Sequence, residues 1–127
     1  MHATPVHASE RRRTETPNAV MTTFASPTLG GSSGLSLWQV EMHAGQRGPL
    51  HEFDSEQLWA VAAGQISMQI ETETVALEEG DAVVLPAGAV RQISALTDAR
   101  MIVCGHGDAV ASVPDEDGPR GVPPWIS

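Results

Sequence analysis

Three polar residues in the middle of the chain suit proton transfer and the binding of negative charge: His51, Gln57 and Arg91. An imidazole titrates near neutral pH, so His51 can act as a general base or acid. The planar guanidinium of Arg91 matches carboxylate, phosphate or enolate oxygens, and the Gln57 amide can orient a carbonyl group. These residue types predict acid–base chemistry beside a carbonyl if the fold points all three into one pocket.

The segments around these residues alternate between apolar and polar side chains, which indicates half-buried β-strands. Trp38, Val40 and Met42, for example, share one face of the segment 37–43. The apolar run 82–85 is typical of a strand that is buried on both faces. The predicted strands cover residues 37–43, 50–53, 57–63, 66–70, 75–77, 82–85, 90–93 and 99–105. Many short strands separated by turn residues, with no helical stretch, predict an all-β barrel or sandwich.

Glycines and a proline stand at fixed distances around the polar residues. Residues 45–64 read G-x5-H-x-F-x3-Q-x6-G, and residues 80–91 read G-x5-P-A-G-x2-R. This layout resembles the two motifs of the cupin superfamily, G-x5-H-x-H-x3-E-x6-G and G-x5-P-x-G-x2-H-x3-N. The resemblance implies a double-stranded β-helix, the cupin jelly-roll barrel, which we expect over residues 29–107.

Many cupins bind a metal ion through four residues of these two motifs. This chain carries a changed set of residues at those positions. Of the four ligand positions only His51 keeps its type, because Phe53, Gln57 and Arg91 replace His, Glu and His. Phe53 cannot ligate, and the permanent charge of Arg91 would repel a cation. We therefore expect no tightly bound metal and no other cofactor. The alternative is one divalent transition metal in a rearranged shell drawn from His51, Gln57, Glu56 and His106.

Without a metal, the pocket predicts a small-molecule enzyme. His51 would be the acid or base, Arg91 the stabiliser of an anion or enolate, and Gln57 the orienting group. Apolar walls for an anionic or enolisable ligand would come from Phe53, Trp59, Met68 and Ile93. By analogy with cupins of natural-product biosynthesis, we expect a cyclase or isomerase acting on a carbonyl-containing, polyketide-like substrate. The alternatives are a ligand-binding module or sensor without catalysis, and a metal-dependent oxygenase.

Composition excludes several other classes of function. The net charge is −9 and the chain contains no lysine, which argues against nucleic acid as a partner. No apolar run approaches the roughly 20 residues of a membrane-spanning helix, so no membrane contact is expected. The single cysteine, Cys104, cannot form an internal disulfide and fits a reducing compartment, which predicts a cytoplasmic protein.

The two ends of the chain differ from its middle. Residues 1–28 are polar and interrupted by prolines, which predicts a flexible or arm-like segment. Residues 108–127 form a proline-rich tail whose Trp125 is expected to pack on the barrel or on a second subunit, because an exposed indole is unfavourable in water. The cupin resemblance also implies a homodimer.

Overall fold

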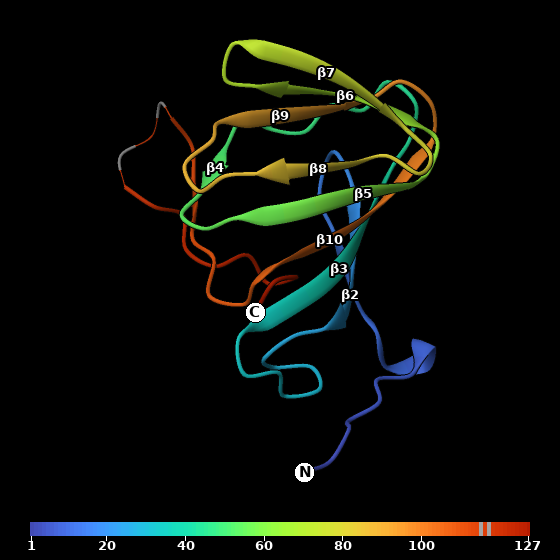
Figure 1. Ribbon diagram of the computed structural model, residues 1–127, viewed down its shortest axis with the longest axis vertical. Coiled ribbons are helices and arrows are strands. Elements are labelled where there is room, and N and C mark those ends of the chain that lie inside the picture. Colours follow the sequence, from blue (N-terminus) through green and yellow to red (C-terminus); the bar gives the residue numbers. More distant parts are fainter. Residues whose placement is uncertain (115, 117) are drawn as a thin grey trace.

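A computed structural model describes residues 1–114, 116 and 118–127, and nearly all of its regular structure is β-strand (Figure 1). A short 3-10 helix, η1, spans Ala8–Glu10. The strands are β1 (Arg12–Glu15), β2 (Val20–Ala25), β3 (Leu35–Met42), β4 (Glu52–Phe53), β5 (Gln57–Ala63), β6 (Gln65–Ile70), β7 (Glu73–Glu78), β8 (Ala82–Leu85), β9 (Arg91–Ala95), β10 (Ala99–His106) and β11 (Ala111–Ser112). No helix among these residues is long and apolar enough to cross a membrane.

The strands form two main sheets with one core between them. The larger sheet has the order β1-β2-β3-β10-β5-β8, the smaller one has the order β7-β6-β9, and β4 pairs with β11. Figure 1 shows the smaller sheet above the larger one. Side chains from both sheets, such as Trp38, Met101 and Met68, belong to one buried cluster. This is the expected all-β jelly roll, although backbone pairing among the described residues does not close it into a continuous barrel.

Alternation along the strands fixes which side chains enter this core. In β3, Trp38, Val40 and Met42 are buried while Glu41 between them is exposed. Successive strand residues point to opposite faces, so one apolar set fills the interior and the other set faces outward. The predicted strand 57–63 coincides with β5, and the segment 66–77 forms the β6–β7 hairpin.

Strand β8 is correctly placed by its apolar run, but the expectation that it is buried on both faces is wrong. Leu85 is fully buried, whereas Val84 is 57% exposed, because successive residues of β8 point to opposite faces and Val84 faces away from the core. Register aligns Val84 with Leu58, and Leu58 with Cys104, which in turn pairs with Leu37. These four residues form an uncharged row across the outer face of the larger sheet, which we call the outer apolar row.

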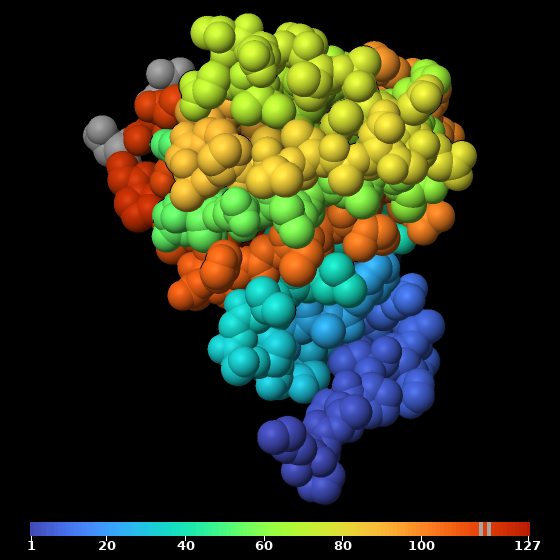
Figure 2. Space-filling view, in the orientation of Figure 1, coloured from blue at the N-terminus to red at the C-terminus, as the bar shows by residue number. Residues whose placement is uncertain are grey.

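The structure also corrects the expected N-terminal arm, because residues 12–25 contain two strands. Strand β2 pairs along β3 with a bulge between Thr23 and Ala25, and β1 pairs with β2. The turn between β1 and β2 is held by Thr16, whose hydroxyl donates to the Ala19 carbonyl oxygen at 2.9 Å. The segment therefore widens the larger sheet, and in Figure 2 only its first residues project from the body of the molecule.

The C-terminal residues are anchored by hydroxyl groups that come from the first third of the chain. Thr23 donates to the Trp125 carbonyl oxygen at 2.7 Å, and Ser36 donates to that of Ile126, whose side chain is fully buried. Trp125 packs against the core of its own barrel. Positions 115 and 117 of the predicted tail lie outside the described residues.

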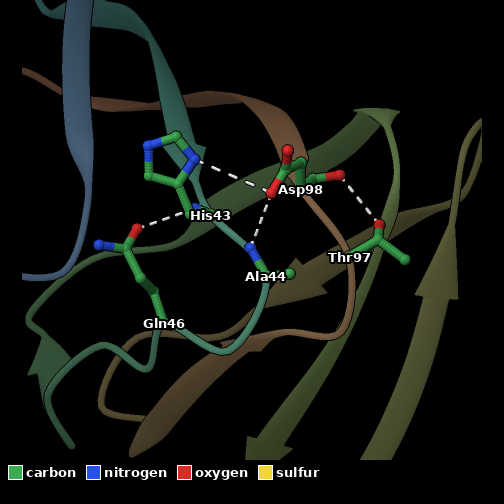
Figure 3. Close-up of polar contacts among 5 residues, drawn as sticks. All are labelled: His43, Ala44, Gln46, Thr97 and Asp98. Carbon is green, nitrogen blue, oxygen red and sulfur yellow. Dashed lines mark hydrogen bonds and ion pairs between the residues drawn. The ribbon is translucent and has the colours of Figure 1, made fainter.

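Two turns at one end of the barrel are tied together by Asp98 (Figure 3). The Asp98 carboxylate accepts from the Ala44 backbone N–H at 2.9 Å and lies 3.8 Å from Nδ1 of His43. Gly64 packs against the same β9–β10 turn, with a φ of +82°. A Cβ at this position would lie 2.1 Å from the Asp98 carbonyl oxygen, so the motif glycine is required sterically.

Candidate functional site

A small cavity of about 70 Å³ lies inside the barrel, between the inner faces of the two sheets. Most of its wall is apolar and comes from β2, β3, β5 and β9 together with the segment before β4. Two of the polar side chains that reach it are His51 and Gln57. The cavity is lined by Thr16, Asn18, Ala19, Met21, Trp38, Val40, Met42, Gly48, Pro49, His51, Phe53, Gln57, Trp59, Ile93 and Trp125.

His51 is positioned as a neutral base by its backbone and its surroundings. Its main chain bridges to that of Arg91 through two hydrogen bonds, which aligns the segment before β4 with β9. The ring Nδ1 lies 2.8 Å from the Pro49 carbonyl oxygen. A carbonyl oxygen can only accept, so Nδ1 carries the proton and Nε2 keeps its lone pair. Burial, and secondarily the charge of Arg91, lower the His51 pKa, although the Pro49 contact opposes this.

Gln57 presents a hydrogen-bond donor to the interior. Its Oε1 accepts from the Trp59 indole N–H at 3.2 Å, and because an indole nitrogen can only donate, this contact fixes the orientation of the amide. The Nε2 group is then directed elsewhere, buried and without a hydrogen-bond partner among the described residues. A buried amide that lacks a partner is costly, so Gln57 favours a ligand that carries an acceptor.

Arg91 is fully buried, and none of its three guanidinium nitrogens has a hydrogen-bond partner among the described residues. Its Cζ lies 5.4 Å from the ring centroid of Phe53, a cation–π contact. His51 meets the same ring edge-on at a centroid distance of 5.4 Å. Burial lowers the Arg91 pKa to about 10, while the charge of Glu52 acts in the opposite direction. The guanidinium thus remains charged at neutral pH.

The predicted site residues fall into two groups. His51, Gln57, Phe53, Trp59 and Ile93 line the cavity together. Arg91 and Met68 also point into the barrel and are fully buried, but they are not among the described residues that line the cavity. Phe53, which lines the cavity, is the neighbour that the Arg91 guanidinium contacts.

The residues at the cupin ligand positions do not fit a divalent metal. A buried guanidinium close to the Phe53 ring raises the potential where a cation would sit. For the rearranged shell, Glu56 and His106 are exposed, and β10 ends at His106, where it pairs with Leu35. Across residues 1–114, 116 and 118–127 there is no group of three His, Cys, Asp or Glu that could hold an ion.

Several lining residues were not predicted from the sequence. Met21 comes from β2, and Trp125 comes from the C-terminal segment, both outside the motif region. A local signal existed only for Trp125, as an apolar residue in a polar tail. Met21 gives no such signal, because its place depends on β2 pairing beside β3.

Comparison with known proteins agrees with this geometry. A cupin-domain family profile matches residues 38–105, and no curated protein sequence matches the chain. Among solved structures, KdgF from Halomonas sp. is 22% identical with a TM-score of 0.69, over 80% of this chain and 93% of that one. An RmlC-like cupin from Shewanella frigidimarina is 14% identical with a TM-score of 0.69, over 80% and 88%.

A larger enzyme shares the fold over part of its length. Salicylate 1,2-dioxygenase from Pseudoaminobacter salicylatoxidans, solved with gentisate adducts, is 18% identical with a TM-score of 0.71. The match covers 83% of this chain but only 31% of the dioxygenase. At such low sequence identities, the TM-scores indicate a common fold and no more. The family profile covers more than half of the chain and agrees with the jelly-roll topology and the motif spacing. The chain is a member of the cupin family.

Proposed function

We propose that this cupin binds a small carbonyl-containing anion in its interior cavity and moves a proton on it, as an isomerase or cyclase. The observation that carries the proposal is the contrast between donors and acceptors around the cavity. The Gln57 Nε2 group and the Arg91 guanidinium are buried donors without hydrogen-bond partners among the described residues, whereas His51 Nε2 is a free base. An acceptor-rich, enolisable ligand complements the Gln57 donor and the His51 base, and its negative charge suits the nearby guanidinium.

In the proposed step, His51 Nε2 takes a proton from the carbon next to the substrate carbonyl. The C–H electron pair moves to form the enolate, whose negative charge develops on oxygen. The Gln57 N–H donates to that oxygen, and the nearby charge of Arg91 lowers the energy of the anion. Return of the proton from His51 to a different carbon gives isomerisation. In cyclisation the enolate carbon bonds to a second carbonyl carbon, the π electrons of that carbonyl move to its oxygen, and His51 returns its proton to the resulting alkoxide.

A binding module without catalysis is the second candidate, and the largely apolar wall of the cavity favours it. Apart from His51 and Gln57, the inner strands contribute residues such as Trp38, Val40 and Met42, which supply contact area but no chemistry. In that case the ligand would stabilise the protein without being converted, and replacement of His51 would leave binding in place.

Deuterium exchange separates these two candidates. Phenylpyruvate in D₂O loses its α-proton signal in ¹H NMR when a base catalyses enolisation. Wild-type protein is expected to accelerate this loss above the buffer rate, and His51→Ala to reduce the acceleration by about 10²–10⁴-fold. His43→Ala is the matched control, because that imidazole is 85% exposed at the surface contact with Asp98. Binding without exchange would favour the module, and exchange that survives His51→Ala would refute the proposed base.

We also propose that two copies associate through the outer apolar row. The net charge of −9 makes most encounters between copies repulsive, but this row across β3, β10, β5 and β8 contains no charged residue. Leu58 and Val84 are 49% and 57% exposed, so pairing two such faces would remove apolar surface from water. Light scattering on purified protein tests this association.

A further inference from the structure

A second, larger hollow lies directly outside the interior cavity. It has a volume of about 480 Å³ and is formed mainly by the two chain ends, namely the β1–β2 turn and the segment 120–125. Both ends lie outside the region 38–105 that matches the cupin profile. His51, Phe53 and Trp125 line the hollow and the cavity alike, so the two spaces meet at these side chains.

The sizes of the two spaces restrict how a ligand can be divided between them. The inner cavity corresponds to about five to seven water molecules, if each needs about 10–15 Å³ of such volume. That volume admits a carboxylate or carbonyl with its adjacent carbon, but not an aromatic ring as well. Any larger ligand whose reactive end reaches Gln57 must extend past His51 into the outer hollow.

The chemistry of the outer hollow suits a flat apolar group. Its wall includes Pro49, Pro123, Pro124 and the Trp125 indole, which are rigid surfaces that lose little conformational freedom when a ring stacks on them. Arg120 lies on the same wall, but its Nε donates to the Glu116 carboxylate at 3.0 Å, so its charge is already compensated. A ring without a charge therefore fits this hollow better than an acidic one.

We infer that the outer hollow binds the aromatic ring of an elongated ligand whose enolisable acid head occupies the inner cavity. The position of the head rests on the proposed function, whereas the position of the ring rests on the hollow itself. Trp125 is then the residue that determines specificity for ring-bearing ligands. The buried Gln57 Nε2, which lacks a hydrogen-bond partner among the described residues, donates a hydrogen bond to the head in this arrangement.

Three probes test whether the head and the ring of a ligand bind in separate spaces. Pyruvate carries the head alone, benzyl alcohol carries the ring alone, and phenylpyruvate carries both. Affinities come from isothermal titration, and contact with the ring is read from the Trp125 indole N–H signal in ¹⁵N NMR. We expect phenylpyruvate to bind at least 10-fold more tightly than pyruvate. Trp125→Ala should remove this difference, so that the ratio of the two affinities falls to about one. Leu96→Ala, which removes a 55% exposed apolar side chain, is the control.

A second variant protects the test against misfolding. Trp125→Ala keeps the backbone carbonyl oxygen that accepts from Thr23. If this variant nevertheless unfolds, Pro124→Ser at an exposed position is used in its place. Pro124→Ser should weaken the binding of phenylpyruvate and benzyl alcohol but not that of pyruvate. Equal binding of pyruvate and phenylpyruvate, with no indole shift from benzyl alcohol, overturns the inference and leaves the proposed function standing. Failure of pyruvate to bind, with benzyl alcohol still shifting the indole signal, overturns the proposed function and supports the ring site.

Discussion

Replacing Arg91 with methionine should stabilise the protein. The guanidinium is fully buried and has no hydrogen-bond partner among the described residues. Burial lowers its pKa to about 10, and at about 1.4 kcal/mol per pKa unit this disfavours the charged form by about 3 kcal/mol. The cation–π contact with Phe53 returns about 1–2 kcal/mol, and methionine fills a similar volume. The free energy of unfolding should therefore rise by about 1–2 kcal/mol, and Tm by about 3–10 °C.

The pH dependence of this gain has a definite sign. The native guanidinium stays charged up to a pH of about 10, so the difference between Arg91→Met and wild type should be constant between neutral pH and a pH of about 9. Above that pH the folded protein releases the proton before the unfolded chain does. The unfolded state then binds more protons, wild-type stability rises with pH, and the advantage of the variant shrinks.

Urea denaturation followed by tryptophan fluorescence, together with calorimetry at pH 7, measures the effect. Arg100→Met is the matched control, because Arg100 is exposed and contacts Gln39 at 3.4 Å, so its replacement should change stability by less than about 0.5 kcal/mol. A loss of more than about 1 kcal/mol for Arg91→Met would refute the reasoning, since it would mean that the guanidinium holds the fold together. A stabilised variant that no longer catalyses exchange would support a functional reason for the buried charge.

Three further predictions concern other parts of the molecule. Because burial lowers the His51 pKa, the exchange rate should be constant at neutral pH and fall only as the pH drops through that lowered value. Removing Arg91 should shift this fall to higher pH, because the charge of Arg91 also lowers the His51 pKa. An NMR titration of His51 that gives a raised pKa would contradict the assignment. Gly105→Ala should lower the free energy of unfolding by about 1–3 kcal/mol and remove most exchange activity, because its Cβ would lie 3.1 Å from Gln57 Cγ. Unchanged stability and activity would show that Gln57 can move without loss and would refute this prediction. Leu58→Glu should give monomers in light scattering, and an unchanged mass would exclude the outer apolar row as the interface.

The middle of the chain was predictable because its signals are local. Alternation placed β5 and an apolar run placed β8 at their observed bounds, and the fixed glycine spacing indicated the cupin fold. Gly64 shows the physical reason, since the spacing is set by a turn that approaches Asp98 too closely for any side chain. Such constraints involve few neighbouring residues and can be seen in a short stretch of sequence.

The ends and the details of the site were not predictable in this way. Strand β2 carries mixed residues with intermediate burial, and only its pairing with β3 makes it a strand. Whether Arg91 reaches the cavity depends on where the Phe53 ring lies, which periodicity does not determine. The apolar character of Trp125 indicated that it packs on the barrel, but its place in the cavity wall depends on a hydrogen bond from Thr23, a residue 102 positions away, and pairings at that range leave no local pattern.

The anchoring of Trp125 and Ile126 by Thr23 and Ser36 also determines when the ligand site can form during synthesis. These hydrogen bonds join residues 102 and 90 positions apart. Thr23 and Ser36 are therefore synthesised well before Trp125 and Ile126, the residues whose carbonyl oxygens they bind. Until residues 125 and 126 have left the ribosome, the nascent barrel lacks one wall of the cavity and exposes apolar surface beside Trp38. Pairing over such distances is slow, so an open-ended barrel should be the species that chaperones encounter. Maturation of the pocket would then lag behind formation of the sheets.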